Sequence, residues 1–389
     1  MSLLIEGARV VVGDGSAPLP VASVRVEGGF VEEVGAGLVP RPGERVLAAQ
    51  GRVLLPGFVD AHTHALWAGD RLADFEQSLA GKTYPEIAAA GGGIWSTVRA
   101  VRKASEGELA ELLSARLALM LREGTTSVEV KSGYGLDVEN ELKMLRAIAL
   151  AQRSFEGTLV ITALLGHALD PADSGFVRRT IEQTLPRVHE EFPDVAVDAY
   201  CEGGAWSVAD CRALFERAAA LGHPLRLHVD QFSRLGGLAL VSELGLRSVD
   251  HLEASSEAEL DTLAASACFG VMLPAASFHL AGPYANARRF VDAGGRLVLA
   301  SNLNPGSAPC SSMPFVIALA VRRAGLSVAE AIVATTSRAA SLLGLADRGR
   351  IEEGQRADLI LLRHRDERLL AFEFGGNPVD HVIVGGRLL

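Results

Sequence analysis

Histidine is the residue type whose placement in this chain most directly indicates chemistry. His62 and His64 stand two residues apart in the stretch "GFVDAHTH", which begins at residue 57. Residues two apart on a strand point to the same face, so both imidazoles face the same way. Three more of the ten histidines end strand-like runs: His167, His228 and His251. A lone strand histidine is usually a core or surface residue, but four separate strands ending on histidine favour a metal site.

Metal-assisted hydrolysis is the chemistry that such a site supports. Imidazole suits both zinc and iron, and a catalytic metal needs about three protein ligands and an open position for water. His62, His64 and His228 supply three ligands, which leaves His251 as a proton carrier. A bound metal lowers the pKa of its water toward about 7 and so supplies hydroxide. The sequence therefore predicts one divalent or trivalent ion, zinc or iron.

Eight apolar, strand-like runs alternate with helical runs in the middle of the chain. They begin at residues 57, 126, 159, 195, 224, 248, 268 and 296. The helical run 105–124 opens with a capping box, Ser105 and Glu108, and ends on Gly124. This alternation predicts a (β/α)8 TIM-like barrel, whose active site lies where its strands end. The alternative, a doubly wound open sheet, lacks a G-x-G-x-x-G motif after its first strand, so the barrel is favoured.

The two ends of the chain read differently from the middle. Both contain short strands punctuated by glycine-rich turns, which is typical of hairpins. Neither end has enough strands to be stable alone. We therefore expect residues 1–55 and 346–389 to pair into one small β-sandwich domain, beside a barrel formed by residues 56–345.

The amino-acid composition and net charge indicate which kinds of molecule the protein could bind. The chain has 389 residues, of which 49% are hydrophobic and 22% charged, as in a globular protein with a large core. The net charge of -10 argues against nucleic-acid and anionic-membrane partners. Residues 1–15 lack the features of a signal peptide, and the four cysteines form no C-x-x-C pair. The expectation is a cytoplasmic protein that acts on a small molecule.

The surroundings of the first two histidines resemble the amidohydrolase superfamily. "LPGFVDAHTH" follows a β-rich beginning and precedes seven further strands. In that superfamily, two histidines of strand one, one of strand five and an aspartate of strand eight bind the metal. Binuclear members add a bridging residue, often a carboxylated lysine on strand four. Strand four here reads "DAYCEGG", without lysine, so the resemblance implies a mononuclear site.

Within that superfamily, the chain is most similar to the imidazolonepropionase family of histidine degradation. The similarity rests on "HTHALWAGDR", "KTYPEIAAAGGGI", "KSGYGL", "DAYCEGG", "HVDQ", "SVDHLE" and "NPGS", in that order. It is dense from residue 54 to 310 and weaker toward both ends. The resemblance implies hydrolysis of the cyclic amide bond of 4-imidazolone-5-propanoate to N-formimidoyl-L-glutamate, by a homodimer.

Several residues are candidates for holding that substrate. Its carboxylate suits an arginine fork, and Arg71 lies seven residues past His64 in the first strand-to-helix loop. Gln231, three residues after His228, can hydrogen-bond both N–H and C=O of the ring, so we expect it to orient the ring. The resemblance implies further contacts at Tyr84, Tyr134, His167, Asn304, Gly306 and Ser307. "NPG" is equally typical of an ordinary turn, and the tyrosines of simple packing.

One position departs from the family pattern. Asn302 stands where the pattern before "NPGS" has the aspartate that binds the metal and takes a proton from the attacking water. An amide oxygen is a weaker ligand and has no useful basicity, and general-base action contributes about 10²- to 10⁴-fold. We therefore expect weakened metal binding and impaired turnover, with His251, Gln231 and Asn302 as the candidate catalytic residues.

Three origins of Asn302 stay open: an introduced change that traps a complex, a natural variant in which His251 takes over as base, and a relative that binds without catalysing. Two alternative functions also stay open. One is another mononuclear amidohydrolase, such as a deaminase of a purine or pyrimidine, for which Arg71 would have no carboxylate to bind. The other is a non-catalytic ligand-binding protein.

Overall fold

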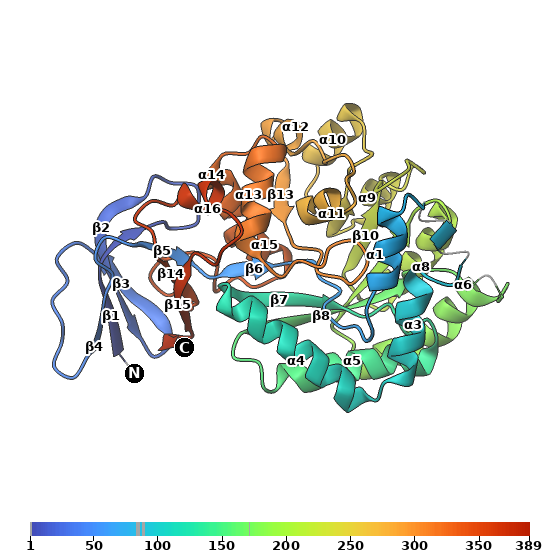
Figure 1. Ribbon diagram of the computed structural model, residues 1–389, viewed down its shortest axis with the longest axis horizontal. Helices are drawn as coiled ribbons and strands as arrows, with labels where there is room; N and C mark the ends of the chain where they lie inside the picture. The colour runs from blue at the N-terminus through green and yellow to red at the C-terminus, as the bar shows by residue number, and fades with distance from the viewer. Residues whose placement is uncertain (1, 83–85, 88–89, 171) are drawn as a thin grey trace.

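A computed structural model describes residues 2–82, 86–87, 90–170 and 172–389. It contains an α/β barrel and a smaller body built of strands, and both chain termini lie in the smaller body (Figure 1). Of two clusters of buried apolar side chains, the larger fills the barrel and takes in residues of the smaller body such as Leu55 and Ile360, and the other lies within the smaller body. The predicted fold class is confirmed.

The barrel is an eight-stranded sheet in which every neighbouring pair is parallel and follows chain order. Its strands are β6 (Phe58–Asp60), β7 (Thr125–Lys131), β8 (Thr158–Gly166), β9 (Ala196–Cys201), β10 (Leu225–Val229), β11 (Ser248–His251), β12 (Phe269–Met272) and β13 (Arg296–Leu299). Strands of this sheet are buried along almost their whole length, as near-continuous apolar sequence requires.

The seam between β13 and β6 is closed by the segments that follow these strands. The backbone N–H of Asn302 donates to the carbonyl of His62 at 3.0 Å, and that of His64 to the carbonyl of Leu303 at 2.9 Å. The carboxylate of Asp60 accepts from the N–H of Ser301 at 3.0 Å. Our prediction of strand one as residues 57–64 was too long, because the chain leaves the regular ladder after Asp60 to make these contacts.

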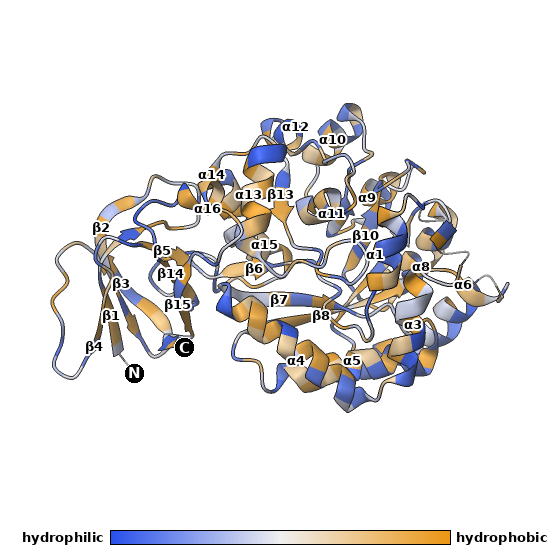
Figure 2. Ribbon diagram, in the orientation of Figure 1, coloured by the Kyte–Doolittle hydropathy of each residue, from blue (hydrophilic) through white to orange (hydrophobic). Residues whose placement is uncertain are grey.

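Helices cover the outside of the barrel, with their apolar sides turned toward the strands (Figure 2). Helix α4 begins directly after Ser105, and the predicted capping box of Ser105 with Glu108 is confirmed. Within the residues that the structure describes, the helices are α1 (Leu72–Leu79), α3 (Ile94–Lys103), α4 (Glu106–Arg122), α5 (Val138–Gln152), α6 (Phe176–Arg179), the π-helical turn η1 (Thr180–Thr184), α7 (Leu185–Glu191), α8 (Val208–Ala220), α9 (Ala239–Leu244), α10 (Glu257–Ala264), α11 (Pro274–His279), α12 (Ala287–Asp292), α13 (Met313–Arg323), α14 (Val328–Thr335), α15 (Ser337–Leu342) and α16 (Leu369–Phe372).

The small β body combines strands from both chain ends in one mixed sheet of order β16-β15-β14-β5-β1-β2-β3, with β4 paired to β1. The strands are β1 (Ser2–Val10), β2 (Leu19–Glu27), β3 (Phe30–Gly35), β4 (Arg45–Ala48), β5 (Val53–Pro56), β14 (Leu359–Leu362), β15 (Val379–Val384) and β16 (Arg387–Leu388). Strand β5 joins the two ends, because it pairs with β1 on one side and β14 on the other. The domain bounds at residues 55 and 346 stay a prediction.

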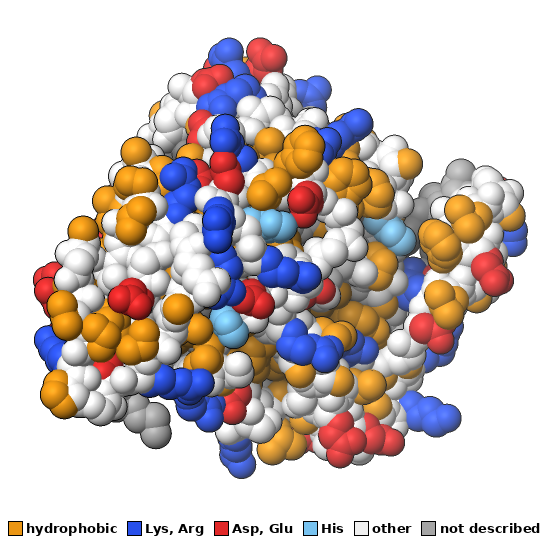
Figure 3. All heavy atoms as spheres, turned by 60° about the vertical axis from the view of Figure 1, so that its left-hand side comes forward, with side chains coloured by type: hydrophobic (Ala, Val, Ile, Leu, Met, Phe, Trp, Pro, Cys, Tyr) orange, Lys and Arg blue, Asp and Glu red, His pale blue; other side chains and the backbone are white. Residues whose placement is uncertain are grey.

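The surface carries both signs of charge. The face in Figure 3 shows lysines and arginines interspersed with acidic residues, and no large field of one sign. Within the described ranges, no helix combines the length and the apolar composition needed to cross a bilayer.

Candidate metal centre

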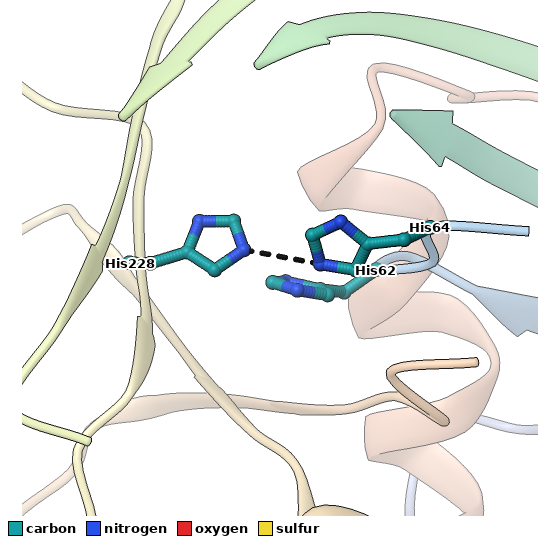
Figure 4. A group of neighbouring side chains, drawn as sticks. All are labelled: His62, His64 and His228. Atoms are coloured by element: carbon teal, nitrogen blue, oxygen red, sulfur yellow. Dashed lines mark hydrogen bonds between the residues drawn. The ribbon is translucent and has the colours of Figure 1, made fainter. Parts of the chain in front are cut away.

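Three imidazoles converge at the C-terminal ends of the barrel strands. His62 and His64 follow β6, and His228 comes from β10 on the opposite side (Figure 4). Each offers a ring nitrogen, and these three atoms lie within 4.8 Å of one another. The Nε2 atoms of His228 and His64 are 3.3 Å apart. The structure brings these three predicted residues together, and their role as metal ligands stays a prediction.

Buried carboxylates fix two of these rings. Nδ1 of His62 lies 2.6 Å from Asp250, and Nδ1 of His228 lies 3.0 Å from Asp198. A neutral imidazole that donates from Nδ1 to a carboxylate keeps its lone pair on Nε2. Carboxylate–histidine pairs of this kind orient metal ligands. Both rings therefore present an unprotonated Nε2 toward the shared space.

Three residues at these strand ends have buried polar atoms without a partner. Nε2 of His62, Nδ1 of His64 and Oδ1 of Asn302 have no hydrogen-bond partner among the described residues. Unpaired buried polar atoms are costly, so they need an explanation. Two nitrogens and an amide oxygen are donors that zinc and iron accept. The residues present thus fit a metal ion.

Burial keeps these imidazoles neutral, the form that binds metal. It lowers the pKa of His62 and His64 well below the usual histidine value, and the ammonium of Lys131 beside His62 and the neighbouring His167 imidazole beside His64 add to the effect. Burial also lowers the pKa of His167 to about 4 and depresses that of His228. Desolvation disfavours the charged imidazolium in each case.

A group of ion pairs inside the barrel holds the two carboxylates. Lys131 contacts Glu129 at 2.7 Å and Asp198 at 2.9 Å, and Arg226 contacts Asp250 at 2.8 Å and Glu129 at 3.2 Å. All five side chains are at most 3% exposed. We call these five residues the barrel charge cluster.

The backbone beyond several strands is held in an unusual conformation. Asp230 after β10, His251 at the end of β11 and Asn302 after β13 all have positive φ, of 55°, 89° and 55°. Positive φ is uncommon for residues other than glycine, and such strain concentrates at functional sites. All three positions lie at the C-terminal ends of barrel strands, the same ends that carry the converging imidazoles.

His251 lies beside the three histidines without belonging to the same group. Its ring centroid is 5.6 Å from that of His228 and 6.1 Å from that of His62. Its Nδ1 is 3.3 Å from the carboxylate of Glu253. The role of His251 as a proton carrier stays a prediction.

Arg71 precedes helix α1 and lies against the loop after β13. Its Nε pairs with Asp74, which also accepts from the N–H of Gly93 at 2.9 Å. A Cβ placed on Gly306 would lie 3.1 Å from an Arg71 nitrogen. Gly306 therefore leaves room for the guanidinium, and two predicted substrate residues are neighbours.

Tyr134 and His167 extend the site past His64. The ring of His167 stacks on that of His64 with centroids 5.1 Å apart, and Tyr134 lies 5.1 Å from His167. Nδ1 of His167 lies 2.9 Å from the carbonyl of Gly133. Tyr84, another predicted contact, falls outside the described residues.

Asn304 shapes its own loop. Its Oδ1 accepts from the N–H groups of Gly306 and Ser307 at 2.8 and 2.7 Å, and its Nδ2 donates to the carbonyl of Asn302 at 2.7 Å. This is the ordinary-turn interpretation of "NPGS". Gln231 is 9% exposed, and its Oε1 accepts from the hydroxyl of Tyr200 at 2.8 Å.

Sequence reasoning missed Asp198, Asp250 and Tyr200 as partners of the site. A signal was present, because a charged residue inside an apolar strand, as in "VAVDAYCE" and "SVDHLE", needs a partner. The identity of that partner depends on how neighbouring strands are offset, and this offset is not written in either strand alone.

Comparison with known proteins agrees with the site. A model of the amidohydrolase family matches residues 53–389. Imidazolonepropionase of Deinococcus radiodurans is 44% identical over 368 residues, 95% of this chain and 92% of its own length. Imidazolonepropionase of Herpetosiphon aurantiacus is 42% identical over 384 residues, 95% of this chain and 90% of its own.

Solved structures share the fold at much lower identity. An adenosine deaminase from Xanthomonas campestris with bound zinc superposes with a TM-score of 0.71 at 20% identity, covering 99% of this chain and 92% of its own. A triazine hydrolase variant gives 0.77 at 19% identity, covering 100% and 94%. Sequence and fold together show that the chain belongs to the imidazolonepropionase family of the amidohydrolases.

Proposed function

We propose that the chain hydrolyses the cyclic amide bond of 4-imidazolone-5-propanoate to N-formimidoyl-L-glutamate, a step of histidine degradation. The observation that carries this proposal is the convergence of His62, His64 and His228 as neutral imidazoles, in a chain 44% identical to an imidazolonepropionase. Three imidazoles at strand ends are the protein ligands of a hydrolytic metal centre.

Four residues are proposed to hold one zinc or iron ion: the three histidines and the amide oxygen of Asn302. When bound, such an ion acidifies a water molecule and polarises a carbonyl group. The barrel charge cluster, through Asp250 and Asp198, holds two of the imidazoles in place. The remaining steps depend on residues that move protons and orient the ring.

His251 is the proposed proton carrier. The carboxamide of Asn302 has no useful basicity, so the proton of the attacking water must go elsewhere. His251 lies within reach of the group, and Glu253 holds its other nitrogen. We expect turnover to persist at a low level, because His251 is less well placed than a carboxylate among the ligands.

Arg71 is the proposed partner of the propanoate arm. Asp74 holds the guanidinium at Nε, which leaves its terminal nitrogens for a carboxylate near Gly306. Tyr134 and His167 line the adjacent side. The negative arm of the substrate would thus lie on the same side as the loop "NPGS".

The direct test compares this chain with its Asn302→Asp form, each supplied with metal, by the loss of imidazolone absorbance. We expect kcat to rise about 10²- to 10⁴-fold in the Asp form. If the Asp form does not hydrolyse imidazolonepropanoate, the assignment is wrong. Metal content measured beside activity identifies the ion as zinc or iron.

Arg71→Ala separates this proposal from a deaminase acting on a neutral base. In the Asn302→Asp background it should lower kcat/KM for imidazolonepropanoate by about 10²-fold, since a paired carboxylate contributes up to about 3 kcal/mol. Arg234→Ala, on an exposed loop arginine, is the matched control. Unchanged kcat/KM in Arg71→Ala would favour the other hydrolases. Tight binding of N-formimidoyl-glutamate without turnover, even in the Asp form, would favour a binding protein.

Two further proposals concern the state of the protein. We propose a homodimer, as the family resemblance implies, and a cytoplasmic location. Light scattering at several concentrations tests the first, and fractionation of the source cells tests the second. A monomer at all concentrations would refute the dimer.

A further inference from the structure

Strand β9 presents two polar side chains on one face. Asp198 and Tyr200 are two residues apart, so both point the same way. Asp198 orients His228, and the hydroxyl of Tyr200 donates to Oε1 of Gln231 at 2.8 Å. The Tyr200 ring also stands edge-on to the His228 imidazole, with centroids 6.0 Å apart. One strand therefore positions both a metal-side imidazole and an amide.

The two ends of the Gln231 amide are in different states. Its oxygen already accepts from Tyr200, whereas no hydrogen bond among the residues that the structure describes has its nitrogen as the donor. The backbone beside it is fixed as well, because Glu202 accepts from the N–H groups of Phe232 and Ser233 at 2.9 and 3.2 Å. Gln231 therefore has N–H donors to offer a ligand.

We propose that Tyr200 is a positioning residue that holds Gln231 with its amide nitrogen toward the ligand. The site then selects a ring that presents a hydrogen-bond acceptor at this point, either a carbonyl oxygen or an unprotonated nitrogen. A ring presenting N–H there would place donor against donor. Only the identification of that ring as imidazolone rests on the proposed function; this ring carries the carbonyl oxygen next to the bond that breaks.

Calorimetry of Tyr200→Phe tests the proposal in the metal-loaded full chain. Titration with 4-imidazolone-5-propanoate gives Kd if the complex persists and KM if it turns over. We expect binding to weaken about 3- to 10-fold, the effect of one hydrogen bond. In the Gln231→Ala background the same change should have no effect, because Tyr200 then has no amide to hold. An equal loss in both backgrounds, or no loss in either, overturns the proposal.

Two controls separate positioning from general damage. Tyr284→Phe removes a hydroxyl from a tyrosine that packs on Arg323, and it should leave binding unchanged. Metal content should be equal in Tyr200→Phe and the unmodified chain, because His228 keeps its contact with Asp198.

NMR of isotope-labelled glutamine side chains tests the orientation without any substrate. The Gln231 signal, assigned by its loss in Gln231→Ala, should shift in Tyr200→Phe while the other glutamines stay unchanged. An unmoved Gln231 signal overturns the role of Tyr200. If the unmodified chain does not bind imidazolonepropanoate, the proposed substrate fails, but the NMR result still decides on Tyr200.

Discussion

Two groups of buried ion pairs lie in the two bodies of the molecule, and they differ in what they hold. The barrel charge cluster contains three carboxylates and two cations. Two of these carboxylates, Asp250 and Asp198, contact the imidazoles of His62 and His228. In the small β body, Arg25 pairs with Glu44 at 3.0 Å, and Glu44 also accepts from Ser2 and from the N–H of Arg41. The Arg25–Glu44 pair thus links β2, the start of β1 and the loop that contains Arg41.

This difference separates two uses of buried charge. Buried ion pairs are weak contributors to net stability, because desolvation offsets their attraction. The pair in the small body needs no further role than joining β2 to the segment before β4. Two carboxylates of the barrel charge cluster contact His62 and His228, so the cost of burying the cluster is explained if its role is to fix the orientation of these rings. Substitutions in each group test whether the two groups of ion pairs have these different roles.

Lys131→Met should have the largest effect. It leaves Glu129 and Asp198 buried without their shared cation, and breaking a buried pair costs about 3 to 5 kcal/mol. Denaturant unfolding measures the loss, and metal analysis should show a depleted protein. Lys103→Met, on the exposed side of α3, is the matched control. Stability equal to that of the control would show that the cluster is not needed.

Asp250→Asn should lower the affinity for metal more than it lowers the stability of the fold. Asn cannot fix the His62 ring as a carboxylate does, and loss of such a partner typically lowers metal affinity about 10- to 100-fold. Competition with a chelator measures this affinity. Asp198→Asn should lower metal affinity in the same way, because Asp198 fixes the His228 ring. Metal affinity unchanged in both variants would remove the distinction between the two groups.

Glu44→Gln provides the opposite case. It removes the charge that Arg25 and the Arg41 N–H contact, so we expect a melting temperature lower by roughly 2 to 4 °C. Metal affinity and activity should not change, because no imidazole touches this pair. A loss of metal in this variant would contradict the comparison.

The smallest expected effect is the pH dependence of the stability difference between the unmodified chain and Glu44→Gln. Burial opposes ionisation of Glu44, but hydrogen bonds from Arg41, Ser2 and Arg25 outweigh it and lower its pKa to about 2. A carboxyl whose folded-state pKa is depressed adds stability above its ordinary pKa, and this stability is lost as pH falls toward 2. The stability difference between the unmodified chain and Glu44→Gln should therefore shrink below pH ~4.5. A constant difference would assign the effect to packing.

Much of the fold was predictable because the barrel strands are local apolar runs with their own boundaries. His62 and His64 were predictable as a pair for the same reason, since spacing along one segment decides their direction. The approach of His228 followed from barrel geometry, which brings all strand ends to one face. Asp250, by contrast, reaches His62 from a strand 188 residues later in the chain, and that contact depends on the offset of the strands.

The seam between β13 and β6 has a consequence for the order in which the protein is made. Asp60 and the two histidines after it are synthesised early, but their partner Ser301 lies 241 residues further along. A ribosome adds residues one at a time from the N-terminus, so most of the barrel is synthesised before the partners of this segment are available. The metal site is thus completed by the same late event that closes the barrel. A chain interrupted before Asn302 would carry all three histidines and still lack a closed site for the ion.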